Sequence, residues 1–331
     1  MTPRKVVALA EGTNAALQQF GTDVERGLAA TPKHLPSVYF YDAAGWQIWQ
    51  RIKDLPEYYL NRAETDIFNQ YSRVMAAQIA PGSVEVIELG AGFSEKTFEF
   101  LSALADRQVC YRPIDVNVDA IERMREEVAK RFPQFSYDGI VGTYETGLRA
   151  LRSHALHEGV TRVFLFLGSN IGNMPSQEER QRVIDIRLLM QGGDRLIVGF
   201  DRFKPLGIMQ AAYDDSQGVT AEFNLNLLRR INRELGGTFD TSAFVHHAYY
   251  SPQMKAMVSW LIATKPQTVK LTKVSETLEF TIKTGEGIWM EVSRKYTDDD
   301  IKELGKYTSL DVRRSFTDLD KLFSVVMFEP R

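Results

Sequence analysis

The chain has 331 residues, of which 44% are hydrophobic and 25% charged, and its formal net charge is −3. These values are ordinary for a globular protein of one large domain or two. A net charge this small provides no field that would gather a polyanion, so nucleic acid is excluded as an expected partner.

The N-terminal stretch, MTPRKVVALAEGTN, is too polar to be a secretory signal. The chain also contains no apolar run of about 18 residues, so we expect neither a membrane-spanning helix nor contact with a membrane. Together these observations favour a cytoplasmic protein, which we expect to be a monomer.

Residues 13–80 have the periodicity of helices. One predicted helix covers residues 42–55, DAAGWQIWQRIKDL, and Pro56 ends it. A second helix is predicted to begin at Asn61, which would act as its N-cap, while Glu64 would reach back in the manner of a capping box. The residues between the two helices, EYY, are predicted to form a polar and aromatic loop.

Apolar strands alternate with helices in the central part of the chain. The predicted strands cover residues 84–89, 109–115, 135–141, 163–168 and 195–200, and the predicted helices lie near residues 95–105, 118–131, 144–157 and 177–191. Strands that are apolar throughout are typical of a parallel sheet covered by helices on both faces. Right-handed crossovers then give an α/β fold with a doubly wound sheet.

The pattern changes after residue 201. A helix is predicted over residues 219–235, and a glycine pair ends it. Four alternating stretches follow and predict an antiparallel sheet: FVHHAYYS, MVSWLIATK, LEFTIKT and IWMEVSRKY. The tail contains one more helix, TDDDIKELGKY, and the strands SLDVRRSF and LFSVVMFEP, which could complete the parallel sheet with an antiparallel edge.

The first central strand runs directly into Gly90-Ala91-Gly92 and then into a helix start. Backbone N–H groups and a helix N-terminus would therefore lie beneath a ligand. A dinucleotide fingerprint requires a third glycine at position 95, but this residue is Glu95, whose charge would repel a pyrophosphate. The spacing of a phosphate-binding P-loop before Lys96 is absent as well, so NAD, FAD and nucleoside triphosphates are disfavoured.

S-adenosylmethionine fits this turn better, because it carries no phosphate and its sulfonium tolerates acidic neighbours. Asp115 ends the second central strand, where its carboxylate could accept from both ribose hydroxyls. Asn173 lies in GSNIGNM after another strand, at the edge where ligands bind, and could hold a carboxylate or an amine. From these residues alone, two alternatives remain open: the glycines could make a tight turn in another kind of doubly wound protein, and Asn173 could serve only to form its own turn.

With these pieces assembled, the chain resembles the histidine Nα-methyltransferase family of ergothioneine biosynthesis over roughly residues 31–331. Members of this family use S-adenosylmethionine to convert histidine to its trimethylated betaine, hercynine. The resemblance rests on the motifs VYFYDAAG, DLPEYYLNRAE, IELGAGFSEKT, PIDVN, FLGSNIGNM, YDDSQGVTAEFN and EVSRKY.

The resemblance implies a class I S-adenosylmethionine-dependent methyltransferase with a Rossmann-like domain and a second, substrate-binding α+β domain. The first would comprise residues 63–203 and 296–331, and the second residues 10–62 and 204–295. S-adenosylmethionine would be the methyl donor, and no metal is expected.

The resemblance also implies which residues would line the methyl donor. They are Gly90, Lys96, Asp115 and the pair Thr143-Tyr144. At the Thr143 position the family commonly has an aspartate that contacts the adenine, so this chain departs from the pattern there.

Four residues would surround the amino-acid end of the substrate: Tyr41, Gly168, Asn173 and Tyr213. Asn173 and Tyr213 would bind the carboxylate. Tyr41 is the candidate catalytic residue, because its hydroxyl could relay the proton of the α-amine and its ring could stabilise the methylated cation.

Tyr58, Glu291 and Ser293 would hold the imidazole. A relative in the same family methylates a prenylated tryptophan, whose apolar ring has no use for a buried carboxylate, so Glu291 and Ser293 favour histidine. Two alternatives remain open. The substrate could be another amino acid or amine, such as a tryptophan derivative, or the chain could be a metabolite-binding protein without catalytic activity.

The histidines do not indicate a metal site. His154 and His157 stand three apart on a predicted helix without a third ligand nearby, and a solvated helix face explains them better. His246 and His247 are adjacent on a predicted strand, so they point to opposite faces and cannot share a metal.

Overall fold

The computed structural model describes residues 4–8, 13–152 and 159–331. The chain divides into two compact units. The first unit comprises Met1–Ala10, Leu60–Phe203 and Lys295–Arg331, and the second comprises Glu11–Tyr59 and Lys204–Arg294. Among the described helices, none is both long and apolar enough to cross a membrane.

The first unit contains an eight-stranded sheet with the order β1-β5-β4-β3-β6-β7-β14-β13. Its strands are β1 (Arg4–Ala8), β3 (Ser83–Leu89), β4 (Val109–Asp115), β5 (Ser136–Val141), β6 (Val160–Phe166), β7 (Arg195–Asp201), β13 (Leu310–Thr317) and β14 (Phe323–Pro330). Neighbouring strands pair in parallel along the order β1-β5-β4-β3-β6-β7, and β14 pairs antiparallel with β7 and β13. The doubly wound sheet and its antiparallel edge are therefore confirmed, whereas β1 was not predicted.

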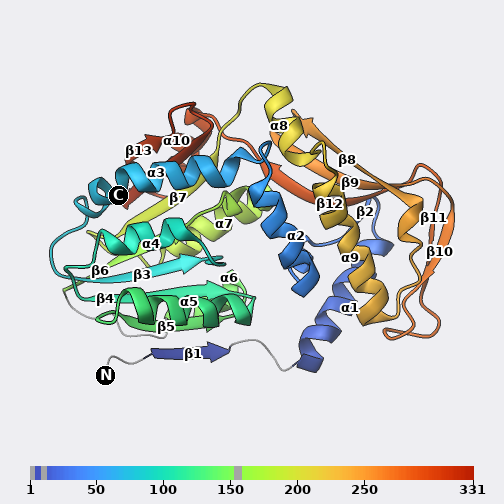
Figure 1. Cartoon of the computed structure of the whole chain (residues 1–331), viewed down its shortest axis with the longest axis horizontal. Coiled ribbons are helices and arrows are strands. Elements are labelled where there is room, and N and C mark those ends of the chain that lie inside the picture. Colours follow the sequence, from blue (N-terminus) through green and yellow to red (C-terminus); the bar gives the residue numbers. More distant parts are fainter. Residues whose placement is uncertain (1–3, 9–12, 153–158) are drawn as a thin grey trace. The chain divides into compact units, whose positions relative to one another are not determined.

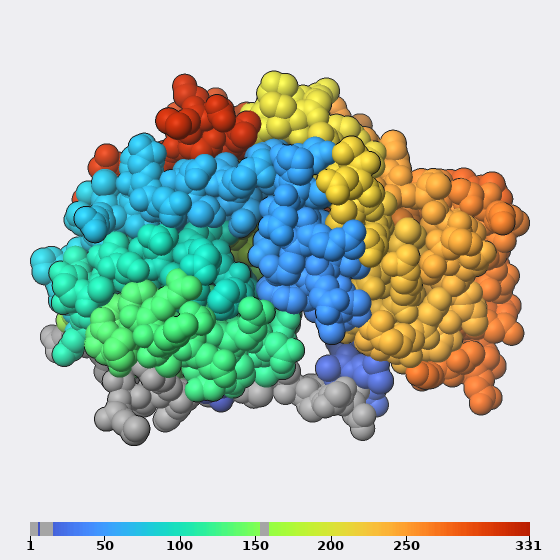
Figure 2. All heavy atoms as spheres, in the orientation of Figure 1, coloured from blue at the N-terminus to red at the C-terminus, as the bar shows by residue number. Residues whose placement is uncertain are grey.

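Helices cover both faces of this sheet. Figure 1 shows three of them lined up along one face, and Figure 2 shows their atoms covering that face: α3 (Tyr59–Ala76), α4 (Glu95–Ser102) and α5 (Val118–Arg131). Side chains of three others share one apolar core with the strands: α6 (Tyr144–Arg152), α7 (Ser176–Arg187) and α10 (Asp298–Tyr307). The chain order reverses between β3 and β6, which is the point where ligands bind to doubly wound sheets.

Two predicted features of these helices need correction or restriction. The helix predicted to begin at Asn61 begins at Tyr59, so Asn61 lies inside it and the capping box with Glu64 was wrong. The helix predicted over residues 144–157 is described as far as Arg152. His154 and His157 lie outside the described residues.

The second unit contains a four-stranded sheet with the order β2-β12-β9-β8. Its strands are β2 (Lys33–His34), β8 (Phe244–Ser251), β9 (Ala256–Ala263) and β12 (Gly287–Arg294). The predicted antiparallel pairing holds for β8, β9 and β12, but LEFTIKT does not join them. Instead β11 (Glu279–Ile282) pairs with β10 (Gln267–Lys270) in a separate two-stranded sheet.

The helices of the second unit are α1 (Thr13–Ala29), α2 (Ala43–Asp54), α8 (Leu206–Tyr213) and α9 (Val219–Leu235). Asp42 caps α2 by accepting from the backbone N–H of Gly45. Gly236, with a φ of 64°, ends α9 as predicted, because a glycine adopts this left-handed conformation without steric cost.

Candidate active site

The glycine turn after β3 is shaped by its neighbours in the first unit. Gly90 has a φ of 68°, and its N–H donates to the carbonyl of Ile114 over 2.9 Å. A Cβ at Gly90 would lie 2.6 Å from Tyr144 Oη and 2.8 Å from Asn170 Nδ2. Gly90 and Tyr144, which were both predicted to line the methyl donor, therefore lie side by side. Asn170 lies beside them, although it was not predicted as a site residue.

Asp115 ends β4 and binds the same turn. Its Oδ2 accepts from the N–H of Gly92 over 2.9 Å, and its Oδ1 accepts from the N–H of Asn117 over 2.8 Å. Burial raises the pKa of Asp115, and these backbone hydrogen bonds oppose that shift. Each carboxylate oxygen has more than one lone pair, so both could still accept from a diol. The predicted role on the ribose thus fits the geometry.

Lys96 lies in the first turn of α4 and is paired inside the protein. Its Nζ lies 2.5 Å from Glu64 Oε2, and the two side chains are 9% and 0% exposed. Both oxygens of Glu64 lie 2.9 Å from the N–H of Gly168, which donates to them. Lys96 and Gly168 were predicted for the donor and the substrate respectively, and Glu64 brings them together.

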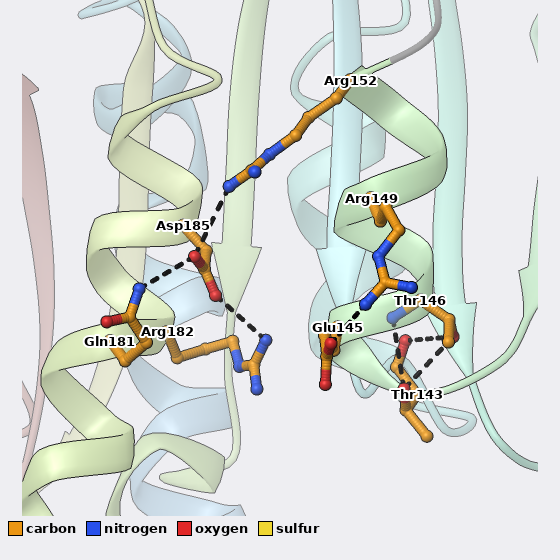
Figure 3. Close-up of polar contacts among 8 residues, drawn as sticks. All are labelled: Thr143, Glu145, Thr146, Arg149, Arg152, Gln181, Arg182 and Asp185. Atoms are coloured by element: carbon orange, nitrogen blue, oxygen red, sulfur yellow. Dashed lines mark hydrogen bonds and ion pairs between the residues drawn. The ribbon is translucent and has the colours of Figure 1, made fainter.

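Thr143 and Tyr144 differ in what their side chains do. Thr143 is exposed, and Figure 3 shows its hydroxyl turned to Thr146, whose backbone N–H donates to it over 3.2 Å at the start of α6. The Tyr144 ring packs edge-on against Phe166 at 5.4 Å between centroids. Thr143 therefore caps a helix, which gives its hydroxyl a structural use independent of a ligand.

The turn after β6 has an unusual backbone. Gly168 and Ser169 have φ values of 70° and 56°, and a short 3-10 helix, Asn170–Asn173, follows. The side chain of Asn173 is partly buried. Its predicted contact with a carboxylate stays a prediction.

In the second unit, polar side chains meet on β12. Glu291 and Ser293 are two residues apart on this strand and so face the same side. Ser293 Oγ and Tyr213 Oη lie 2.6 Å apart, and both residues are buried. Glu291 stands across from the buried Ser259 of β9. Tyr213 and Ser293, predicted for different ends of a substrate, thus form one hydrogen-bonded pair.

An aromatic cluster contains the two remaining predicted residues of the second unit. Tyr41 packs edge-on against Trp49 and Phe223, with centroids 5.9 and 5.6 Å apart. Tyr58 also packs edge-on against Trp49, with ring centroids 5.5 Å apart. Trp49 and Phe223 were not predicted as site residues, because their spacing on helices indicates an ordinary apolar face.

Among residues 4–8, 13–152 and 159–331, no three His, Cys, Asp or Glu side chains are grouped so that they could hold a metal ion.

Glu88 lies in β3, two residues before the glycine turn, and is buried. Thr97 Oγ1 and Tyr111 Oη donate to its two carboxylate oxygens over 2.8 and 2.5 Å. Burial nevertheless raises the pKa of Glu88 from 4.5 to about 7. The folded chain therefore holds this proton more tightly than the unfolded chain does.

This difference predicts a pH dependence of stability. The contribution of the Glu88 proton is complete below about pH 4.5 and is lost as the pH rises through about 7. Relative to a Glu88→Gln variant, we expect the free energy of unfolding of the unmodified chain to fall by about 3 kcal/mol across this window. Urea unfolding of both proteins at the two ends of the window measures it, and a constant difference would contradict it.

The doubly wound sheet, the glycine turn at its switch point and the carboxylate after the next strand define the class of S-adenosylmethionine-dependent methyltransferases. Residues 20–330 match the family model described as "Histidine-specific methyltransferase, SAM-dependent", and the chain belongs to this family. The fold class and the methyl donor expected from the sequence are thereby confirmed.

Curated relatives agree with this assignment. A histidine N-alpha-methyltransferase of Mycolicibacterium smegmatis is 35% identical over 290 residues, which cover 87% of this chain and 88% of the relative. The Mycobacterium tuberculosis protein of the same name is 35% identical over 287 residues, covering 86% and 87%. Ergothioneine biosynthesis protein 1 of Neurospora crassa is 27% identical over 274 residues, covering 78% of this chain and 31% of that protein.

Proposed function

We propose that this chain transfers three methyl groups in turn from S-adenosylmethionine to the α-amino nitrogen of L-histidine and so forms hercynine, in the pathway to ergothioneine. Membership of the histidine-specific family and the names of the full-length relatives support this proposal. The observation that carries the choice of substrate is the polar set on β12, Glu291 and Ser293, with the bond from Ser293 to Tyr213.

This polar set matches a neutral imidazole. One ring nitrogen of imidazole carries a proton and the other is an acceptor. Glu291 would accept from the protonated nitrogen. Ser293, two residues further along the same strand, would contact the other nitrogen. An indole has an N–H but no acceptor nitrogen, so it could not accept a hydrogen bond from Ser293.

Binding of the donor would rest on residues of the first unit. Asp115 would accept from the ribose hydroxyls, and Lys96 would face the carboxylate of the methionine part. Because Gly90 carries no side chain, Tyr144 and Asn170 can approach its backbone closely, and these two side chains would lie beside the donor.

The chemistry is a displacement at the methyl carbon. The lone pair of the amine forms the new C–N bond while the C–S bond breaks. The electron pair of the C–S bond stays on sulfur, so the donor leaves as S-adenosylhomocysteine. The first two transfers also release an amine proton, which Tyr41 or water could relay. The third leaves a fixed positive charge, and the Tyr41 ring, held by Trp49 and Phe223, could stabilise it by about 0.5–2 kcal/mol.

Mass spectrometry tests the proposal directly. The purified protein is incubated with S-adenosylmethionine and either histidine, tryptophan or other free amino acids. We expect histidine alone to gain one, two and then three methyl groups. Methylation of tryptophan in preference to histidine would contradict the substrate, and donor binding without any turnover would favour a non-catalytic protein.

We also propose that the chain acts as a monomer in the cytoplasm. Light scattering should then give a mass near 37.6 kDa, and a mass twice as large would contradict the first part of this proposal.

A further inference from the structure

Glu64 has contacts in the first unit that its sequence position did not indicate. It lies in α3 and is not exposed, and its carboxylate contacts both Lys96 Nζ and the N–H of Gly168. Glu64 is also closely packed against the neighbouring strand β7. A Cβ at Gly199, on β7, would lie 2.2 Å from Glu64 Oε1, so a side chain there would have to displace this oxygen.

A carboxylate this deeply buried is uncommon unless it is paired and hydrogen-bonded. Here the Lys96 ammonium contacts Oε2, and the Gly168 N–H donates to both oxygens. Neither Lys96 nor Gly168 can move away without leaving a buried polar group unpaired, which is costly. Glu64 therefore fixes the position of both.

The turn that Glu64 binds continues toward the glycine turn of the donor. Ser169 follows Gly168, and its Oγ accepts from the N–H of Asp201 over 3.2 Å. Asp201 in turn pairs with Lys295 over 2.7 Å, and neither side chain is exposed. The next residue, Asn170, lies against Gly90. The Glu64 carboxylate thus holds Gly168, and the backbone N–H of Asp201, whose own side chain is paired with Lys295, holds Ser169.

We propose that Glu64 is a positioning residue for methyl transfer. Through Lys96 it sets the part of the site that would receive the donor, and through Gly168 it sets the turn from which Asn170 reaches Gly90. The expected effect on activity rests on the proposed function. The claim that Glu64 holds Lys96 and Gly168 in place does not depend on the substrate.

The decisive variant is Glu64→Gln. A carboxylate accepts on both of its oxygens, whereas an amide accepts on its oxygen and donates from its nitrogen. The oxygen should turn toward the Lys96 ammonium, because an NH2 group there would be repelled. The NH2 group then takes the place of Oε1, so one of the two oxygens that accept from the Gly168 N–H is replaced by a donor that opposes it. We therefore expect the 168–170 turn to shift.

We expect kcat/KM for histidine, at saturating donor, to fall at least about tenfold, as for loss of a hydrogen bond to a charged group. The Kd of S-adenosylhomocysteine, measured by calorimetry, should change less than about threefold, because Lys96 keeps an acceptor. Hydrogen exchange measured by mass spectrometry should show lost protection in the peptide that contains Gly168.

The matched control is Glu85→Gln. Like Glu64, Glu85 is a buried carboxylate with charged partners: Arg162 Nε lies at 2.7 Å and Arg112 Nε at 2.9 Å. It lies, however, at the opposite end of β3 from the glycine turn. We expect this variant to lose stability and to keep kcat/KM and the protection of Gly168 within about twofold.

A Glu64→Gln protein with kcat/KM and Gly168 protection within twofold of the unmodified chain would overturn the proposal, and so would an equal loss in Glu85→Gln. If Glu64→Gln does not fold, Gly199→Ala replaces it, because the added methyl displaces the carboxylate without removing its charge. If the unmodified chain does not methylate histidine, the proposed function fails, while the exchange measurement still tests Glu64.

Discussion

Replacing Glu291 by alanine is expected to raise the Kd for histidine about 10- to 100-fold and to leave the Kd of S-adenosylhomocysteine unchanged. The variant removes the acceptor proposed for the imidazole N–H. A hydrogen bond to a charged group contributes about 1.5–3 kcal/mol, which sets the size of the effect. Glu291 belongs to the second unit, and the residues proposed for the methyl donor belong to the first. The variant should therefore lose affinity for histidine without losing affinity for S-adenosylhomocysteine.

Calorimetry with histidine, on protein saturated with S-adenosylhomocysteine, measures this loss. Glu279→Ala is the matched control, because Glu279 is an exposed glutamate on β11 of the same unit. It should bind histidine as the unmodified chain does. Unchanged histidine binding by the Glu291→Ala protein would show that Glu291 does not contact the imidazole.

Replacing Gly90 by alanine should weaken binding of S-adenosylhomocysteine at least about 100-fold. A left-handed backbone costs a residue with a Cβ about 1–2 kcal/mol, and the Cβ would also lie within 3 Å of Tyr144 and Asn170. Both contacts are with the ends of side chains, which can rotate away. The protein should therefore fold, but with these two side chains displaced from the donor site.

Gly92→Ala separates the two causes. Gly92 also has a left-handed backbone, with a φ of 51°, but no atom lies within 4 Å of the position of its Cβ. This variant carries the backbone cost without displacing Tyr144 or Asn170, so it should bind S-adenosylhomocysteine more tightly than Gly90→Ala does. Equal affinities of the two variants would mean that Tyr144 and Asn170 take no part in binding.

The central strands could be predicted because their signal is local. Each is a short apolar run with a turn on either side, and β4 and α5 begin and end at the predicted residues. The glycine turn and Asp115 follow from the same reasoning, since the carboxyl ends of parallel strands meet at one edge of the sheet. Distant pairings have no such signal, and LEFTIKT was assigned to the wrong sheet for this reason.

Glu64 shows the limit of local reasoning within the candidate site. Its neighbours in the sequence suggested a helix cap, whereas its acceptor oxygens serve an amide 104 residues away. Asn170 was missed because its neighbours, Gly168 and Ser169, indicate only a turn, while its contact is with Gly90. Thr143 was predicted for the adenine, but its hydroxyl also has a partner in its own helix.

By itself, the sequence determined the doubly wound order of strands and helices and the edge at which the residues proposed for the methyl donor gather. Both depend on periodicity and on turns that a few consecutive residues encode. Only the tertiary structure decided which buried charges pair, as Glu64 does with Lys96 and Asp201 with Lys295. A buried charge requires a partner, but nothing in the sequence around it says which distant residue will supply that partner.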